Sequence, residues 1–155
     1  MIKEKLYLIC PDCHIELAIK SKFDQNAYFI TALGAVFHNY VQTIEHFVDR
    51  KMISEIIIVN DTHCTFIENT ICKKNYGTNE ELELRRLQHN HAEAFASLAG
   101  IKQQELLAKL NIYRQAYEIL EDDALVHKIN EQSIILSGLT YNRESAVFEY
   151  LALPF

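Results

Sequence analysis

The segment Ile53–Cys64 reads ISEIIIVNDTHC and decides the fold. Its β-branched run Ile56–Val59 is too short for a helix and too apolar for a strand with one solvated face. We therefore expect a central strand that is covered on both faces, as in a parallel sheet. A carboxylate, an imidazole and a thiol follow at once, at Asp61, His63 and Cys64. Ligands bind at the carboxyl ends of strands in open parallel sheets, so these residues mark a candidate site.

The composition is that of one globular domain, which we assign to residues 1–155. Of the 155 residues, 49% are hydrophobic and 23% are charged, a balance that argues against disorder. The net charge of −6 argues against a nucleic-acid partner, because phosphate binding needs a basic face. No apolar run approaches the length of a membrane-spanning helix, and no signal peptide is evident. We expect a cytoplasmic protein with no membrane partner, in which the four cysteines are reduced.

The order of the predicted elements indicates an α/β fold. A first buried strand covers residues 6–9 and ends before Pro11, and a short strand covers residues 28–30. An apolar stripe at helical spacing predicts a helix over residues 36–51, which crosses over to the central strand. More helices are expected near Thr65 and at residues 79–98 and 103–120, followed by hairpin strands at 133–137 and 146–151. The prediction is a mostly parallel β-sheet with helices on both faces and an added antiparallel edge strand.

Three stretches of this sequence resemble the β-class carbonic anhydrases. Cys10–His14 reads CPDCH, where the family ends its first strand with Cys-x-Asp-x-Arg. Asp61–Cys64 reads DTHC, where the family follows a β-branched strand with His-x-x-Cys. Gly138–Leu151 is similar to the family's last hairpin. The resemblance spans nearly the whole chain and implies a β-carbonic-anhydrase-like fold.

The resemblance also implies a zinc site, for which Cys10 and Cys64 match the two thiolate ligands. Asp61 stands where the family has its histidine ligand, and His14 stands where it has an arginine. Asp12 matches the aspartate that pairs with that arginine and opens the zinc to water. We therefore expect Cys10, Asp61 and Cys64 to hold the metal, with Asp12 and His14 as the catalytic residues. A carboxylate in place of an imidazole donates more negative charge, which should weaken the activation of water.

The function that these residues imply is the zinc-dependent, reversible hydration of carbon dioxide to bicarbonate, with weak or lost activity. Three alternatives stay open. His63 could replace Asp61 as a ligand if the loop turned differently. The chain could be a non-catalytic member of the fold that binds a metal or a small anion. The motif Cys10-x-x-Cys13 could instead serve a thiol-based redox or regulatory protein.

The apolar residues of the crossover segment predict a second subunit. The family assembles through this helix and the edge of the sheet. This segment has more large apolar side chains than one small domain is expected to cover, namely Val36, Phe37, Tyr40 and Phe47. We therefore expect a homodimer.

Overall fold

The computed structural model describes residues 2–11, 15–23 and 26–153. Its centre is a five-stranded sheet in the order β2-β1-β3-β4-β5. The strands are β1 (Glu4–Ile9), β2 (Tyr28–Thr31), β3 (Ile53–Asp61), β4 (Ile135–Asn142) and β5 (Val147–Leu151). The first four run parallel, and β5 pairs antiparallel with β4 at the edge. The predicted sheet is therefore confirmed.

The predicted central strand is β3, which lies between β1 and β4. All four residues of Ile56–Val59 are buried, because helices or loops cover both faces of the sheet at this position. The strand continues through Asn60 and Asp61, which are also completely buried. The carboxylate of the candidate site therefore belongs to the strand itself, not to the loop that follows it.

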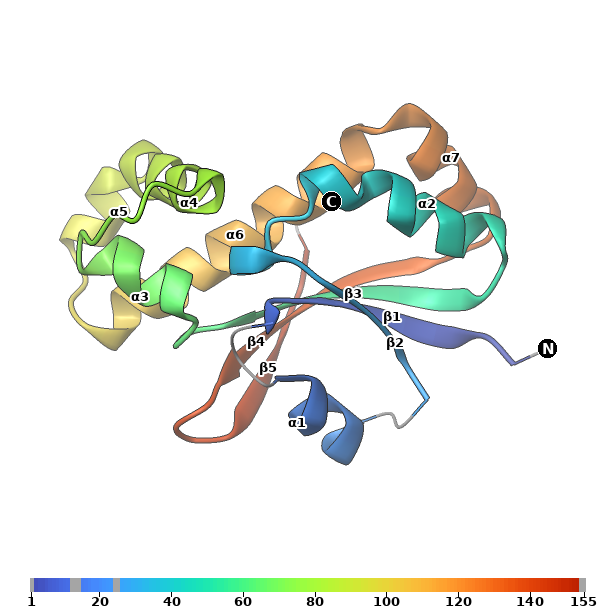
Figure 1. Ribbon diagram of the computed structural model, residues 1–155, viewed down its shortest axis with the longest axis horizontal. Coiled ribbons are helices and arrows are strands. Elements are labelled where there is room, and N and C mark those ends of the chain that lie inside the picture. Colours follow the sequence, from blue (N-terminus) through green and yellow to red (C-terminus); the bar gives the residue numbers. More distant parts are fainter. Residues whose placement is uncertain (1, 12–14, 24–25, 154–155) are drawn as a thin grey trace.

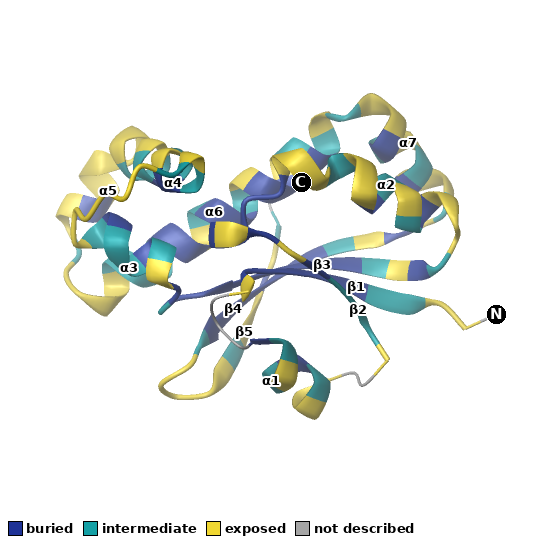
Figure 2. Cartoon of the chain, in the orientation of Figure 1, coloured by how far each residue is buried: buried dark blue, intermediate teal, exposed yellow. Residues whose placement is uncertain are grey.

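Helices cover the two faces of the sheet unequally (Figure 1). The helix α1 (Ile15–Lys22) lies on one face, and α2 (Val41–Asp49), α6 (Ile101–Glu121) and α7 (Asp123–Glu131) lie on the other. The helices α3 (Thr65–Ile71), α4 (Asn79–Asn90) and α5 (Ala92–Ala96) gather beside one end of α6. Figure 2 shows buried residues along α6, whereas α4 and α5 are largely exposed. Helices on both faces were predicted, and this is confirmed.

Within the described part of the chain, no helix combines the length and the apolar character that crossing a membrane requires.

Three helix predictions differ from the structure. The helix expected over residues 36–51 is shorter, because two 3-10 turns at Leu33–Ala35 and His38–Tyr40 precede α2. The helix expected over residues 79–98 breaks at His91 into α4 and α5. The helix α7 was not predicted. Its N-cap is Asp122, whose carboxylate accepts the Leu125 N–H at 2.9 Å and so satisfies a free donor of the first turn.

The segment before α2 also corrects the argument for a second subunit. Val36 and Phe37 are 6% and 1% exposed, so the chain covers these side chains itself. Tyr40 is 37% exposed, and Phe47 packs partly buried against the core. The apolar residues of this segment are therefore mainly core residues, and the homodimer stays a prediction.

A buried polar network links β3 to α6 and to the turn before α2. The Asn111 side-chain amide donates to the Asn60 Oδ1 at 2.7 Å and to the Gly34 carbonyl at 2.9 Å. Its oxygen accepts a hydrogen bond from the Gln115 side chain at 3.1 Å, and Gln115 accepts the Phe37 N–H at 2.8 Å. Each of these buried polar groups has a partner, as burial requires. The network fixes α6 against the carboxyl end of β3.

Replacing Asn111 by leucine keeps a similar volume but leaves the Asn60 and Gly34 oxygens without this donor. Because an unsatisfied buried polar group costs 1–3 kcal/mol, we expect Asn111→Leu to lower the free energy of unfolding by about 3 kcal/mol. Urea denaturation followed by circular dichroism measures the change. The matched control is Asn130→Leu on the exposed side of α7, which should change stability by no more than about 0.5 kcal/mol. Equal effects of the two substitutions would contradict a structural role for the network.

Candidate metal site at the carboxyl edge of the sheet

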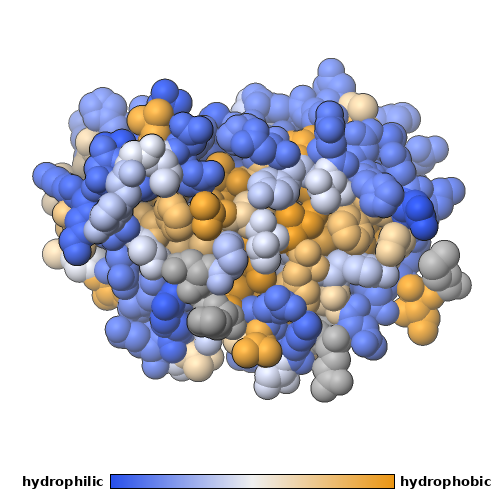
Figure 3. Space-filling view, viewed as in Figure 1, coloured by the Kyte–Doolittle hydropathy of each residue, from blue (hydrophilic) through white to orange (hydrophobic). Residues whose placement is uncertain are grey.

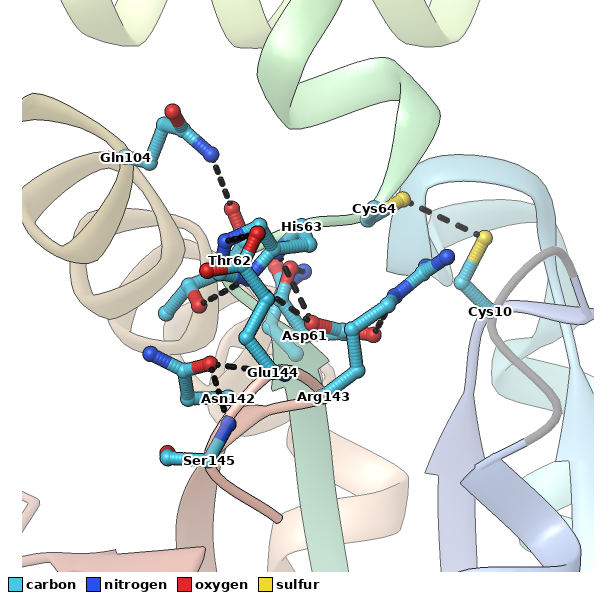
Figure 4. A network of polar contacts seen from close by, with 11 residues as sticks. Cys10, Asp61, Thr62, His63, Cys64, Gln104, Asn142, Arg143, Glu144 and Ser145 are labelled. Atoms are coloured by element: carbon cyan, nitrogen blue, oxygen red, sulfur yellow. Dashed lines mark hydrogen bonds and ion pairs between the residues drawn. The ribbon is translucent and has the colours of Figure 1, made fainter. Parts of the chain in front are cut away.

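Parallel pairing of β1 with β3 brings two cysteines together. Cys10 follows β1 directly, and Cys64 ends the turn after β3 and forms the N-cap of α3. The Cys64 N–H donates to the Asp61 carbonyl at 3.1 Å, which closes that turn. The Cys64 thiol then lies 3.5 Å from the Cys10 sulfur (Figure 4). Both cysteines are buried, and the structure brings their sulfurs together; that they bind a metal stays a prediction.

Asp61 lies at the end of β3 with both carboxylate oxygens engaged. Its Oδ1 accepts the His63 backbone N–H at 2.8 Å, and its Oδ2 accepts the Arg143 Nε–H at 2.8 Å. The side chain is completely buried, so an ionised carboxylate at this position needs such partners to remain stable. The guanidinium of Arg143 is the cation that compensates this charge.

Arg143 reaches the site from the hairpin between β4 and β5. Asp61 is aligned with Tyr141 on β4, and the Thr62 N–H donates to the Tyr141 carbonyl at 2.8 Å. The Asn142 Oδ1 accepts the backbone N–H groups of Glu144 and Ser145, which fixes the turn. In Figure 4, the Arg143 side chain extends from this turn to Asp61, on the side that faces the two cysteines.

Sequence reasoning missed Arg143, although a signal for it exists. The chain has an acidic residue at 61 and lacks an arginine at 14, so the site needs a cation from elsewhere. If β3 and β4 are neighbours, the turn after β4 is the nearest segment that can supply one. Arg143 is the cationic residue of that turn.

The imidazole of His63 points to the hairpin, not to the cysteines. Its Nδ1 lies 3.1 Å from the Thr62 hydroxyl, and its Nε2 lies 3.4 Å from a carboxylate oxygen of Glu144. Both ring nitrogens therefore have polar partners away from the thiols. This arrangement does not favour the alternative in which His63 replaces Asp61 as a ligand.

A small cavity opens beside Cys10. Its volume is about 270 Å³, and most of the side chains that line it are apolar. Ile15 and Leu17 of α1 and Thr31 of β2 are among them. Cys10 lines this cavity and is itself buried.

The donor types at this site suit zinc, but the third donor is held by an arginine. Two thiolates, each about 2.3 Å from a tetrahedral zinc, lie about 3.8 Å apart, close to the observed 3.5 Å. A carboxylate is also an accepted zinc ligand. Among the residues that the structure describes, however, no three His, Cys, Asp or Glu side chains are already grouped to hold a metal. Asp12, Cys13 and His14 lie outside the described residues.

The sheet order, the helices on its two faces and the cysteine pair at its carboxyl edge define an α/β fold of the β-carbonic anhydrase type. The β-carbonic anhydrase CafA of Aspergillus fumigatus superposes with a TM-score of 0.84 at 20% identity, covering 98% of this chain and 77% of that one. A tetrameric β-carbonic anhydrase of Sordaria macrospora has a TM-score of 0.84 at 16% identity, with coverages of 97% and 81%. The Coccomyxa β-carbonic anhydrase, solved with acetazolamide, has a TM-score of 0.74 at 16% identity, with coverages of 96% and 72%.

These likenesses confirm the resemblance at the level of the fold. No protein-family model matches the sequence, and no curated protein matches it either. The low identities fit a divergent member of this fold.

Proposed function

We propose that this protein is a divergent, zinc-dependent member of the β-carbonic anhydrase fold with weak or lost activity toward carbon dioxide and bicarbonate. The observation that carries the proposal is the pair of buried thiols, 3.5 Å apart, at the carboxyl ends of neighbouring parallel strands. In this proposal Cys10 and Cys64 are zinc ligands and Asp61 is the third. Bound zinc would supply a Lewis acid that activates water for attack on carbon dioxide.

The remaining residues have proposed roles around this metal. Asp12 orients the attacking water, and His14 is its partner when protonated. The apolar cavity beside Cys10 suits carbon dioxide, which is small and has no net charge. The proposal places the protein in the cytoplasm, where thiols stay reduced and free to bind metal.

Metal content tests the ligands. Protein purified without added zinc or chelator should contain close to one zinc per chain. Cys10→Ser and Cys64→Ser should each lose it, because removal of one thiolate leaves too few ligands for a stable site. The matched control is Cys72→Ser, because Cys72 is exposed and lies outside the site, and it should keep the metal. Equal zinc in all four samples would contradict the assigned ligands.

Stopped-flow hydration of carbon dioxide tests the chemistry. We expect zinc-loaded protein to raise the hydration rate above the buffer rate. Asp12→Asn should lower that excess rate by about 100-fold, because proton transfer by a positioned group contributes at least that much. The parent protein could bind zinc that Cys10→Ser loses and still show no rate above the buffer rate. That result would make the site a non-catalytic metal site.

The same short sulfur–sulfur distance favours one second candidate, a dithiol switch. Oxidation of Cys10 and Cys64 by hydrogen peroxide would form a disulfide, and the reduced peroxide would take up the two thiol protons and leave as two water molecules. Absence of zinc, together with a mass loss of about 2 Da that Cys64→Ser abolishes, would favour this reading over the metal site.

We also propose a homodimer. Apolar residues gather across the middle of the face seen in Figure 3. The described residues include large exposed apolar side chains on α1 and before α2, with Leu17 70% exposed and Leu33 46% exposed. Burial of such surface stabilises association. Light scattering at micromolar concentration should give twice the chain mass, and a monodisperse monomer would overturn this prediction.

A further inference from the structure

We propose that a second cavity, between the β4–β5 hairpin and the N-terminal part of α6, binds a small primary ammonium compound. Its volume is about 250 Å³, and two glutamates and two threonines are among the residues that line it, namely Glu105, Glu149, Thr62 and Thr140. Figure 4 shows Thr62 on the side of Asp61 that faces away from the two cysteine sulfurs. The cavity is therefore separate from the candidate metal site, and the inference does not rest on the proposed function.

The register of β4 with β5 builds one wall of this cavity. Thr140 is aligned with Glu149, and Asn142 is aligned with Val147. Residues that are directly opposed in an antiparallel pair, or two apart on one strand, share a face of the sheet. These four residues therefore lie on one face, and all four line the cavity. Glu105 lines it from α6, which packs against β4.

The hydroxyl of Thr140 is the observation that points to a ligand. Thr140 is only 8% exposed. Within the described part of the chain, however, its hydroxyl forms no hydrogen bond. Most buried polar groups in native proteins have a partner, because an unpaired one costs free energy. An ammonium group in the cavity would donate to this oxygen and give it the partner that the chain does not supply.

The charge of the cavity favours a cationic ligand. None of the described residues that line it is a lysine or an arginine. Glu105 pairs with Lys102 at 3.2 Å in an exposed ion pair on α6. Glu149, by contrast, forms no ion pair with any described residue. The cavity therefore contains a carboxylate whose charge is not balanced by the chain, which an anionic ligand would leave unpaired and a cation would neutralise.

The available partners suit an ammonium group better than a metal ion. Nowhere in the described ranges are three His, Cys, Asp or Glu side chains grouped to hold a metal. An ammonium group has three donors, which match the carboxylates of Glu105 and Glu149 and the hydroxyl of Thr140. The Asn142 Oδ1 is used within the turn, which leaves the Asn142 side-chain NH₂ as a donor for an oxygen of the ligand. A short amino alcohol combines these features.

The experiment titrates ethanolamine hydrochloride into the ¹⁵N-labelled full chain in phosphate buffer, which contains no competing amine. Amide chemical shifts report both the affinity and the place of binding. We expect a dissociation constant of about 1 mM, a strength that a ligand of so few atoms can reach, with the largest shifts around Thr140 and Glu149. Ethylene glycol, which has the same size and no charge, should give no saturable shift. Calcium chloride tests a metal ion in place of the ammonium group.

Four variants test the assigned partners. Glu149→Gln should weaken ethanolamine binding about tenfold, because it replaces a charged acceptor by a neutral one, and Glu105→Gln should act in the same direction. Thr140→Val should also weaken binding, but it should not lower the midpoint of urea denaturation, because the hydroxyl has no partner in the chain. The matched control is Glu93→Gln, an exposed position on α5, which should bind as the parent does.

Several results would overturn the site. These are no saturable shift with ethanolamine, equal binding of ethylene glycol, or an affinity of Glu149→Gln equal to that of Glu93→Gln. Saturable binding of calcium without binding of ethanolamine would overturn the ammonium class. The Cys64→Ser variant should bind ethanolamine as tightly as the parent, whether or not the parent holds zinc. The outcome for this cavity is therefore distinguishable from the outcome for the proposed function.

Discussion

The pairing of β3 with β1 on one side and β4 on the other is the constraint on which the site depends. In a parallel pair the strands end at the same edge, so whatever follows β1, β3 and β4 must meet there. Cys10, Asp61 and the turn that carries Arg143 come from three segments far apart in the sequence. Hydrogen bonding of the sheet alone makes them neighbours. The chemistry of the site is therefore a consequence of strand order.

Asp61 and Arg143 are best understood as one unit. The Asp61 side chain is completely buried at the end of β3. An ion placed in that interior without a partner would destabilise the protein. The arginine of the last hairpin removes that cost, and together the pair carries no net charge. A buried carboxylate at residue 61 is thus tolerated through a residue 82 positions away.

The sequence predicted the structure correctly where the hydrophobic pattern of a segment agrees with its burial. The β-branched run at Ile56–Val59 predicted the buried strand, and the family resemblance predicted that Cys10 and Cys64 would lie at one site. Side-chain contacts across the hairpin were not predictable, because Arg143 in a polar turn has the same pattern as a solvated residue. The buried hydrogen bonds of Asn111 and Gln115 were not predicted either, for a related reason. They lie on the buried side of α6 among aliphatic side chains, and helical spacing does not reveal which polar residues find buried partners.

The hairpin that holds Arg143 follows β3 in the chain and is synthesised after it. Asp61 leaves the ribosome with β3, long before β4 is available to pair with it and before the arginine exists. Until β4 and β5 join the sheet, the carboxylate has to stay hydrated. This end of β3 therefore cannot be buried before those strands pair. Burial of this carboxylate therefore waits until β4 and β5 have been synthesised. Any event that frays the β4–β5 hairpin in the mature protein would reopen the same edge to water.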